Sequence, residues 1–301
     1  IEMTYEPIWG SIIAWYLFLA GLGGGAFVTA VFIRFRHPAC ARLVRIGRII
    51  APTVVIVGLC LLMFDAAAGF AHPLRFALLL TNFGSVMTWG VVFLAAFVIV
   101  ALIVLALDLL KRAVPEWLDI AGMVLGLCVA VYTGCLLGVC QGFPLWNTAL
   151  LPILFLVSAV STGMAAVLLA GVFAAPDEFN AVVVLKKFHF WLPVVELVLV
   201  AALLFVTAAN PSSAGWESVM TLIAGRWAVC FWLLFVVVGL VLPTVLECWM
   251  LWIASHELET SRTGQMVSAL SDAGVLIGGF VLRLMIVSAA LPITIVQPWM
   301  L

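Results

Sequence analysis

The sequence predicts an all-α, polytopic membrane protein with eight transmembrane helices and both termini on the non-cytoplasmic side. Three observations lead to this fold class: a composition too apolar for water, eight apolar stretches of spanning length, and basic residues confined to alternate connections. Of the 301 residues, 66% are hydrophobic and only 9% are charged, and the mean hydropathy is +1.33. A soluble domain of this length could not bury so much apolar surface, so lipid is the expected solvent.

Each predicted span is close to or above the roughly 20 apolar residues that cross a bilayer as a helix. The eight stretches cover 11–33, 49–66, 86–108, 119–140, 148–173, 190–208, 227–252 and 267–292. They are continuous and do not alternate, which favours helices over the strands of a barrel. The first stretch is too long for a signal-peptide core and lacks a small-residue cleavage site after it, so it is expected to remain as a span.

The domain organisation follows from the short connections, none of which could form a soluble domain. We expect one integral membrane domain over 1–301, with two four-helix bundles as its natural division. Helices one to four then occupy 1–147 and helices five to eight occupy 148–301. No internal repeat supports that division, so it remains an expectation.

Orientation follows from the lysines and arginines. Ten of the 13 basic residues lie in four alternate connections, namely 34–48, 109–118, 174–189 and 253–266. Connections rich in Lys and Arg face the cytoplasm. The sequence therefore predicts a multi-pass protein of a bacterial or archaeal cytoplasmic membrane with periplasmic termini. Asp108, at the cytoplasmic end of the third span, is expected to be a solvated helix end.

Metal and haem ligands are scarce in this chain. The seven cysteines form no CxxC pair, so iron–sulfur or zinc ligation by cysteine is not expected. The four histidines lie in connections or at helix ends, and no CxxCH motif is present, so haem is not expected either. The sequence predicts no metal site, and chemistry carried by ordinary side chains or a non-covalent organic ligand.

Two of the three tyrosines are predicted to lie at one depth on the outer side of the membrane. At a rise of about 1.5 Å per residue, Tyr16 in the first span and Tyr132 in the fourth are each about 12 Å below the outer face. Asp65 and Trp89 are expected at a shallower depth, at the outer ends of the second and third spans. The first four helices thus direct polar or aromatic groups toward one outer pocket.

Two interpretations of the buried phenols stay open. Tyr132 could bond a carbonyl of a neighbouring helix, because a buried phenol needs a hydrogen-bond partner. Alternatively, both phenols could bind a ligand with polar oxygens and an apolar body that enters from the bilayer, as a quinone does. Asp65 would then accept or deliver the proton that accompanies quinone reduction.

A second polar set lies in the last three spans. Glu196, Glu247 and Asp272 are predicted a turn or two below the cytoplasmic face, and Arg283 lies deeper. Charged groups inside a membrane are costly and are retained for a purpose. They could form an internal salt-bridge network around Arg283, or a proton path leading inward from the cytoplasm.

Four strings resemble the NrfD-like family, which contains the membrane subunit of polysulfide reductase. They are "IAWYLFLAGLGGGAF" (13–27), "HPLRFALLLTNFGSVMTWG" (72–90), "YTGCLLGVCQGFPLWNTALLPILFLVSAVSTG" (132–163) and "GGFVLRLMIV" (278–287). The most specific piece is the tyrosine–threonine–glycine segment followed by Pro-Leu-Trp-Asn and Leu-Pro. The resemblance extends over essentially the whole chain.

The resemblance implies a haem-free membrane subunit that exchanges electrons between a membrane quinone, with menaquinone favoured over ubiquinone, and an iron–sulfur ferredoxin-like subunit. That partner would in turn serve a molybdopterin catalytic subunit on the outer side. Tyr132 would bond the quinone head group, and Tyr16 stands where the polysulfide reductase subunit has a contributing histidine. Many relatives carry Asp-Leu-Gly-Arg-Pro where this chain has 69–73, so the acid is absent there and Asp65 lies one helical turn earlier.

The outer loop adds further candidates for cofactor binding. Trp89, His72, Arg75 and Asn82 could lie near the quinone or contact the iron–sulfur partner, or they could anchor lipid headgroups. Trp146 is expected at the membrane interface as an amphipathic anchor. Two rival functions remain: a secondary transporter, which would need broken helices in corresponding positions of two halves, and a passive anchor that only tethers its partners.

Overall fold

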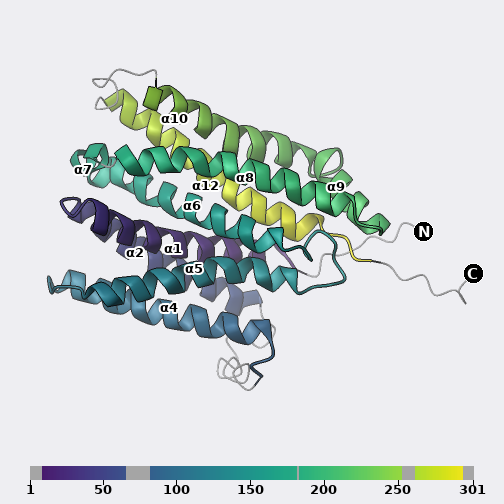
Figure 1. Cartoon of the computed structure of the whole chain (residues 1–301), viewed down its shortest axis with the longest axis horizontal. Coiled ribbons are helices and arrows are strands. Elements are labelled where there is room, and N and C mark those ends of the chain that lie inside the picture. Colours follow the sequence, from purple (N-terminus) through teal and green to yellow (C-terminus); the bar gives the residue numbers. More distant parts are fainter. Residues whose placement is uncertain (1–8, 66–81, 182, 253–261, 294–301) are drawn as a thin grey trace, which may run out of the picture.

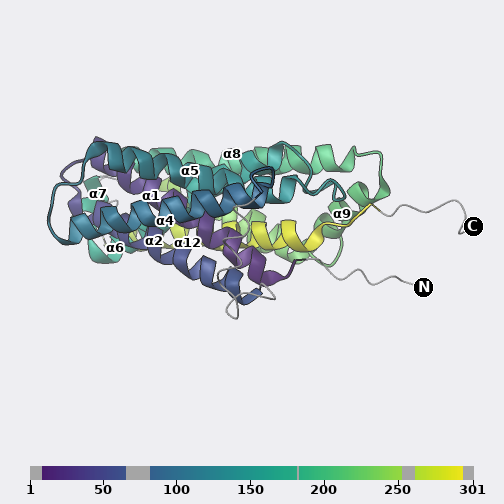
Figure 2. The same cartoon turned by 90° about the horizontal axis from the view of Figure 1, so that it is seen from below.

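The described part of the chain consists of long helices that run side by side. The computed structural model describes residues 9–65, 82–181, 183–252 and 262–293. Figure 1 shows most of the long helices running along one axis, and Figure 2 shows the same elongated bundle turned by 90°. No strand occurs in these ranges.

Eight helices are long and apolar enough to cross a membrane, which confirms the predicted fold class. They are α1 (Ser11–Arg36), α2 (Ala41–Asp65), α4 (Val86–Leu109), α5 (Glu116–Gly138), α6 (Leu150–Ala174), the Phe188–Ala208 part of α8 (Val183–Ala208), the Cys230–Met250 span formed by η2 and α10, and α12 (Arg262–Ala289). Most of the boundaries lie within about four residues of the predicted ones.

The second helix begins earlier than predicted, at Ala41 rather than at 49. The connection after α1 is therefore short, and Arg42, Arg45 and Arg48 lie within α2. A carboxylate from the next group of helices stabilises this early start, because the Leu43 amide donates to Glu178 Oε2 at 2.9 Å. Such a partner satisfies one of the amide groups that a helix leaves unpaired in its first turn.

The spans pack into one continuous bundle, and for description we call α1, α2, α4 and α5 the first helix group and α6, α8, η2, α10 and α12 the second. The helix α6 contacts α1, α2 and α5 as well as α8 and α12, and α12 also contacts α1, so the division into two four-helix bundles stays a prediction. Glycines allow the close approach of α1 to α6: a Cβ at Gly25 would overlap the carbonyl of Ala159, and a Cβ at Gly163 would overlap the Gly25 backbone. Small residues let membrane helices approach closely, so Gly25 and Gly163 determine the distance between the groups.

Three elements were not foreseen from the sequence. Short helices α7 (Pro176–Ala181) and α9 (Ser213–Ile223) lie in connections, at opposite ends of the bundle in Figure 1. The seventh span starts as a π-helix, η2 (Cys230–Val241), and continues as α10 (Leu242–Trp252). Stretches with i→i+5 bonds are rare and are frequent at functional sites.

Candidate functional site

Tyr16 of α1 and Tyr132 of α5 lie at the same depth along the bundle, and their side chains lie close to each other. Their side chains are 2% and 7% exposed, and the two phenols are within direct electrostatic range. The helix register explains the shared level, since Tyr16 lies five residues after the start of α1 and Tyr132 six residues before the end of α5. The structure therefore brings together the two tyrosines that the sequence pairs.

A glycine lies against each tyrosine ring. Gly90 of α4 faces the Tyr132 ring so closely that a Cβ there would overlap the ring and its hydroxyl. A Cβ at Gly58 of α2 would lie 3.7 Å from Tyr16 Cδ2. The rings thus lie in a space between α1, α2, α4 and α5. Neither hydroxyl has a hydrogen-bond partner within the described ranges, so the interpretation that Tyr132 bonds a neighbouring carbonyl finds no such bond there.

A pocket of about 380 Å³ lies one helical turn beyond Tyr132, toward the C-terminal end of α5. Its lining includes Leu136 and Val139 of α5, Val86 and Met87 of α4, and Trp9 before α1. Met87 and Val139 are about half exposed, so the pocket adjoins the lipid-facing surface of α4 and α5. The tyrosines do not line this pocket, and the side chain of Leu136 lies on the way from it to Tyr132.

The remaining candidates of the first helix group lie further out. Asp65 ends α2 and is exposed, about 10 Å along the helix from Gly58. Trp89 is 45% exposed, and its Nε1 donates to the carbonyl of Phe83 at 3.1 Å. Asn82 supports the turn before α4, because its Oδ1 accepts from the Gly84 amide at 3.1 Å. His72 and Arg75 lie outside the described residues.

Trp146 is not the interface anchor that the sequence suggested. It is 2% exposed, stacks on Trp9 with ring centroids 5.2 Å apart, and donates from Nε1 to the Ile286 carbonyl of α12 at 2.7 Å. Phe143 stacks on it at 4.2 Å. The segment between α5 and α6 therefore connects α12 with the residues before α1, at the end of the bundle that lies beyond the tyrosines.

Arg283 and Glu196 share a polar layer inside the second group. Arg283 is fully buried, and its Nη1 donates to Ser158 Oγ at 3.0 Å and to the Gly279 carbonyl at 2.7 Å. The Glu196 carboxylate lies near Ser158 and is electrostatically coupled to the Arg283 guanidinium. No direct ion pair joins Glu196 and Arg283 among the described residues, and the guanidinium Nε and Nη2 of Arg283 have no hydrogen-bond partner there. Arg283 also lies over the Phe155 ring, 5.2 Å from its centroid.

Glu247 and Asp272 meet a histidine that the sequence did not single out. His189 of α8 is 1% exposed, and its Nδ1 lies 2.7 Å from Glu247 Oε1 and 3.7 Å from Asp272 Oδ1. Ser271 donates its hydroxyl to Glu247 Oε1 at 3.1 Å. His189 lies seven residues before Glu196 on α8, so two turns separate this cluster from the Arg283 layer. This seven-residue spacing, which places His189 and Glu196 on one face of α8, was the sequence signal that could have identified His189.

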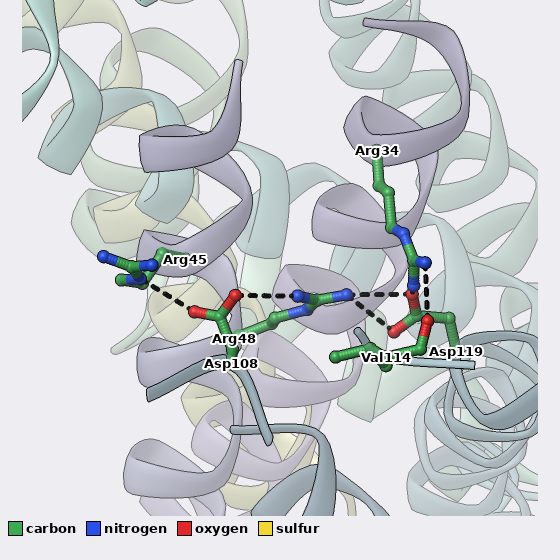
Figure 3. Close-up of polar contacts among 6 residues, drawn as sticks. All are labelled: Arg34, Arg45, Arg48, Asp108, Val114 and Asp119. Carbon is green, nitrogen blue, oxygen red and sulfur yellow. Dashed lines mark hydrogen bonds and ion pairs between the residues drawn. The ribbon is translucent and has the colours of Figure 1, made fainter. Parts of the chain in front are cut away.

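The opposite end of the first group holds a network of arginines and carboxylates, drawn in Figure 3. Arg48 donates to both oxygens of Asp119, at 2.9 and 3.1 Å, and to Asp108 Oδ1 at 3.1 Å. Arg45 also pairs with Asp108, and Arg34 pairs with Asp119. Asp108 is therefore an ion-paired residue and not the solvated helix end that was expected.

Comparison with known proteins places this sequence in a family. The model of the family described as "Polysulphide reductase, NrfD" matches residues 1–295. The C subunit of polysulfide reductase from Wolinella succinogenes is 33% identical over 315 residues, which cover 96% of each protein. Protein NrfD of Escherichia coli is 28% identical over 314 residues, which cover 94% of each protein. The NrfD homolog of Haemophilus influenzae is 26% identical over 319 residues, which cover 95% of each protein.

These matches confirm the resemblance that the four strings indicated. The family match covers nearly the whole chain, and so do the relatives. Together with the eight spanning helices, they support one identification. The chain is a multi-pass membrane protein that belongs to the NrfD polysulphide reductase family.

Proposed function

We propose that this chain is the quinone-reactive membrane subunit of a respiratory oxidoreductase complex. A membrane quinol, with menaquinone favoured, binds near Tyr16 and Tyr132 at the periplasmic side. Its oxidation releases two electrons to an iron–sulfur ferredoxin-like subunit, which serves a molybdopterin catalytic subunit, and two protons to the outside. The reverse direction uses the same groups. The polysulfide reductase relative supports the assignment to a reductase complex.

The pairing of the two buried phenols is the observation that carries this proposal. Two hydroxyls from different helices lie at one level and have no hydrogen-bond partner in the described ranges. A phenol in apolar surroundings needs a hydrogen-bond partner, and the oxygen of a bound ligand would supply one. A quinone carbonyl accepts such a bond, and its ring and tail suit the apolar surroundings.

The pocket near Leu136 offers a route from the bilayer to the tyrosines. It begins at the half-exposed Met87 and Val139 and ends one turn from Tyr132. A quinone that enters there must displace the Leu136 side chain to reach the phenols. Asp65, Trp89, Asn82, Arg75 and His72 belong to the outer surroundings of this site in the proposal.

The direct test replaces Tyr132 by Phe, which removes the hydroxyl and keeps the ring against Gly90. We expect quinol-dependent turnover of the assembled complex to fall by about fivefold to a hundredfold, because leaving the quinone oxygen without this donor costs about 1–3 kcal/mol. Turnover from an artificial electron donor to the catalytic subunit should stay unchanged. Unchanged quinol turnover in a fully assembled complex would contradict the proposal, as a passive anchor would predict.

The proposal extends to protons through the second helix group. Glu196 lies near Ser158 and Arg283, and two helical turns along α8 separate it from His189, which contacts Glu247 and Asp272. In the proposal these groups act as one polar column inside the membrane. Buried acids in such columns are typical of proton relays. We infer that the column conducts protons from the cytoplasmic side during turnover.

Glu196→Gln tests the column, because glutamine keeps the shape of the side chain and cannot release a proton. In proteoliposomes, quinol turnover should persist while proton uptake from the compartment that corresponds to the cytoplasm falls at least about tenfold. The exposed Glu217→Gln at the opposite end is the matched control. Equal proton uptake in both variants would show that Glu196 does not belong to a proton path.

A further inference from the structure

The cluster of His189, Glu247 and Asp272 has the composition of a metal site. Its three ligand atoms, one imidazole nitrogen and two carboxylate oxygens, lie within 4.8 Å of one another. They come from three helices, α8, α10 and α12. His189 and Asp272 are almost fully buried.

Helix packing directs the two carboxylates toward the histidine. The helices η2 and α12 cross at Gly239 and Gly278, where a Cβ at either position would lie 2.5 Å from the other glycine's Cα. Asp272 lies six residues before this crossing on α12, and Glu247 lies eight residues after it on the seventh span. Glu247 lies in α10, which continues directly from the π-helix η2.

We propose that His189, Glu247 and Asp272 bind one divalent metal ion of the zinc type. In a tetrahedral site with metal–ligand bonds of about 2.0–2.1 Å, neighbouring ligand atoms are about 3.3 Å apart. The separations of His189 Nδ1 from Glu247 Oε1 and from Asp272 Oδ1, 2.7 Å and 3.7 Å, lie on either side of that value.

Charge balance also favours a divalent ion at this site. Two carboxylates and a neutral imidazole carry two negative charges inside a membrane, where unpaired charge is costly. One ion of charge +2 neutralises them, and metal ligands are held in their deprotonated forms. Glu247 Oε2 is enclosed and has no hydrogen-bond partner among the described residues, so this oxygen is available as an additional ligand.

The surroundings of the ligands match those of metal sites. Ser271 donates its hydroxyl to the Glu247 carboxylate, and Ser161 lies near the His189 ring. Outer partners of this kind fix the orientation of ligating histidines and carboxylates. Because a ligating carboxylate cannot also carry a proton, a bound ion would close the proposed proton column at Glu247 and Asp272. The ion site itself is independent of quinone binding.

Metal titration of the full chain, purified with its attached partner subunits and stripped by a chelator, tests the proposal. We expect one Zn²⁺ per chain above the metal content of the partner subunits. Co²⁺ in its place should give the absorption of a four-coordinate site. His189→Ala and the isosteric Asp272→Asn should each weaken Zn²⁺ binding by more than about 100-fold, since even outer partners cost about 10–100-fold.

His37→Ala is the matched control, because His37 lies in the short connection between α1 and α2 and outside the cluster. It should leave Zn²⁺ binding unchanged. If His189→Ala reduces the amount of folded chain, Asp272→Asn and the Zn²⁺-dependent rise in melting temperature decide the question. Absence of stoichiometric binding, or equal binding by the wild type and Asp272→Asn, would overturn the proposal and leave the cluster as a hydrogen-bonded group.

Discussion

At the scale of single residues, Gly90 is as important to the proposed site as the tyrosines themselves. The Tyr132 ring occupies the volume that any larger side chain at position 90 would fill. The position of the hydroxyl therefore depends on a residue that carries no functional group. Tyr16 is less constrained, because Gly58 is in ordinary contact with its ring.

Gly90→Ala should disturb the site without removing any polar group. The added methyl group displaces the Tyr132 ring, and a misplacement of about 1 Å can cost up to about a hundredfold in rate. We expect quinol-dependent turnover to fall by more than about tenfold. Gly138→Ala on α5 is the control, because its Cβ would be 3.7 Å from the Trp146 carbonyl oxygen. Similar turnover in the two variants would show that the ring position is unimportant.

Asp119 is the residue on which the charge network depends. Its side chain is fully buried, and it pairs with Arg34 and Arg48. Asp119→Ala leaves the buried Arg48 with one carboxylate fewer, and removing one partner of a buried pair typically costs about 3–5 kcal/mol. We expect a clearly lower midpoint of thermal unfolding in detergent. The exposed Glu116→Ala, on the same helix, should change stability by less than about 0.5 kcal/mol; equal shifts would contradict this account.

The depths calculated from the helix rise predicted the tyrosine pair, but they could not predict which side chains form ion pairs or hydrogen bonds with each other. Tyr16 and Tyr132 were paired because both helices are regular and their ends are marked in the sequence. The ion pairs of Arg48 and Asp119, and the contact of His189 with Glu247, depend on helix rotation. Hydropathy does not encode rotation. His189 was assigned to a helix end, and Trp146 to the interface, for this reason.

At the scale of elements, the close contact of α1 with α6 at Gly25, Ala159 and Gly163, here called the seam, holds the two helix groups together. Backbone atoms of Gly25, Ala159 and Gly163 approach so closely that no side chain fits between them. Close backbone contact replaces the hydrophobic effect as a source of helix association in lipid. The sequence does not reveal which helix packs against the glycine-rich part of α1.

Gly25→Val should therefore prevent correct packing of the two groups. The branched side chain would overlap the α6 backbone, and overpacking of this kind costs at least about 1–3 kcal/mol. We expect little monodisperse protein after size-exclusion chromatography. Gly142→Ala, where nothing lies within 4 Å of a Cβ, should elute like the wild type. A well-packed, thermally stable Gly25→Val protein would contradict the seam.

The second and seventh spans show why the ends and helix types of the spans were harder to predict than their existence. The arginines in the first turns of α2 suggested a connection. In the structure Arg45 and Arg48 are part of the helix, where they pair with Asp108 of α4 and Asp119 of α5. The π-helix η2 has an apolar sequence like those of its neighbours. Within it, Gly239 lies close against Gly278 of α12, a contact that the sequence pattern does not reveal.

At the scale of the whole molecule, the two ends of the first helix group differ in kind. One end is held by the ion pairs of Figure 3, which join α1, α2, α4 and α5. The other end has the pocket beside Leu136 and the tyrosine pair. A rigid charged end and an apolar, accessible end suit a site that takes its ligand from the bilayer near one membrane face.

The amount of quinone that remains bound to the purified complex tests the central proposal most directly. Wild-type complex, extracted in mild detergent and washed, should carry about one quinone per chain. The double variant Tyr16→Phe, Tyr132→Phe should lose most of it while the complex stays assembled. Retention of stoichiometric quinone by the assembled double variant would contradict the assignment of the phenols as the head-group ligands.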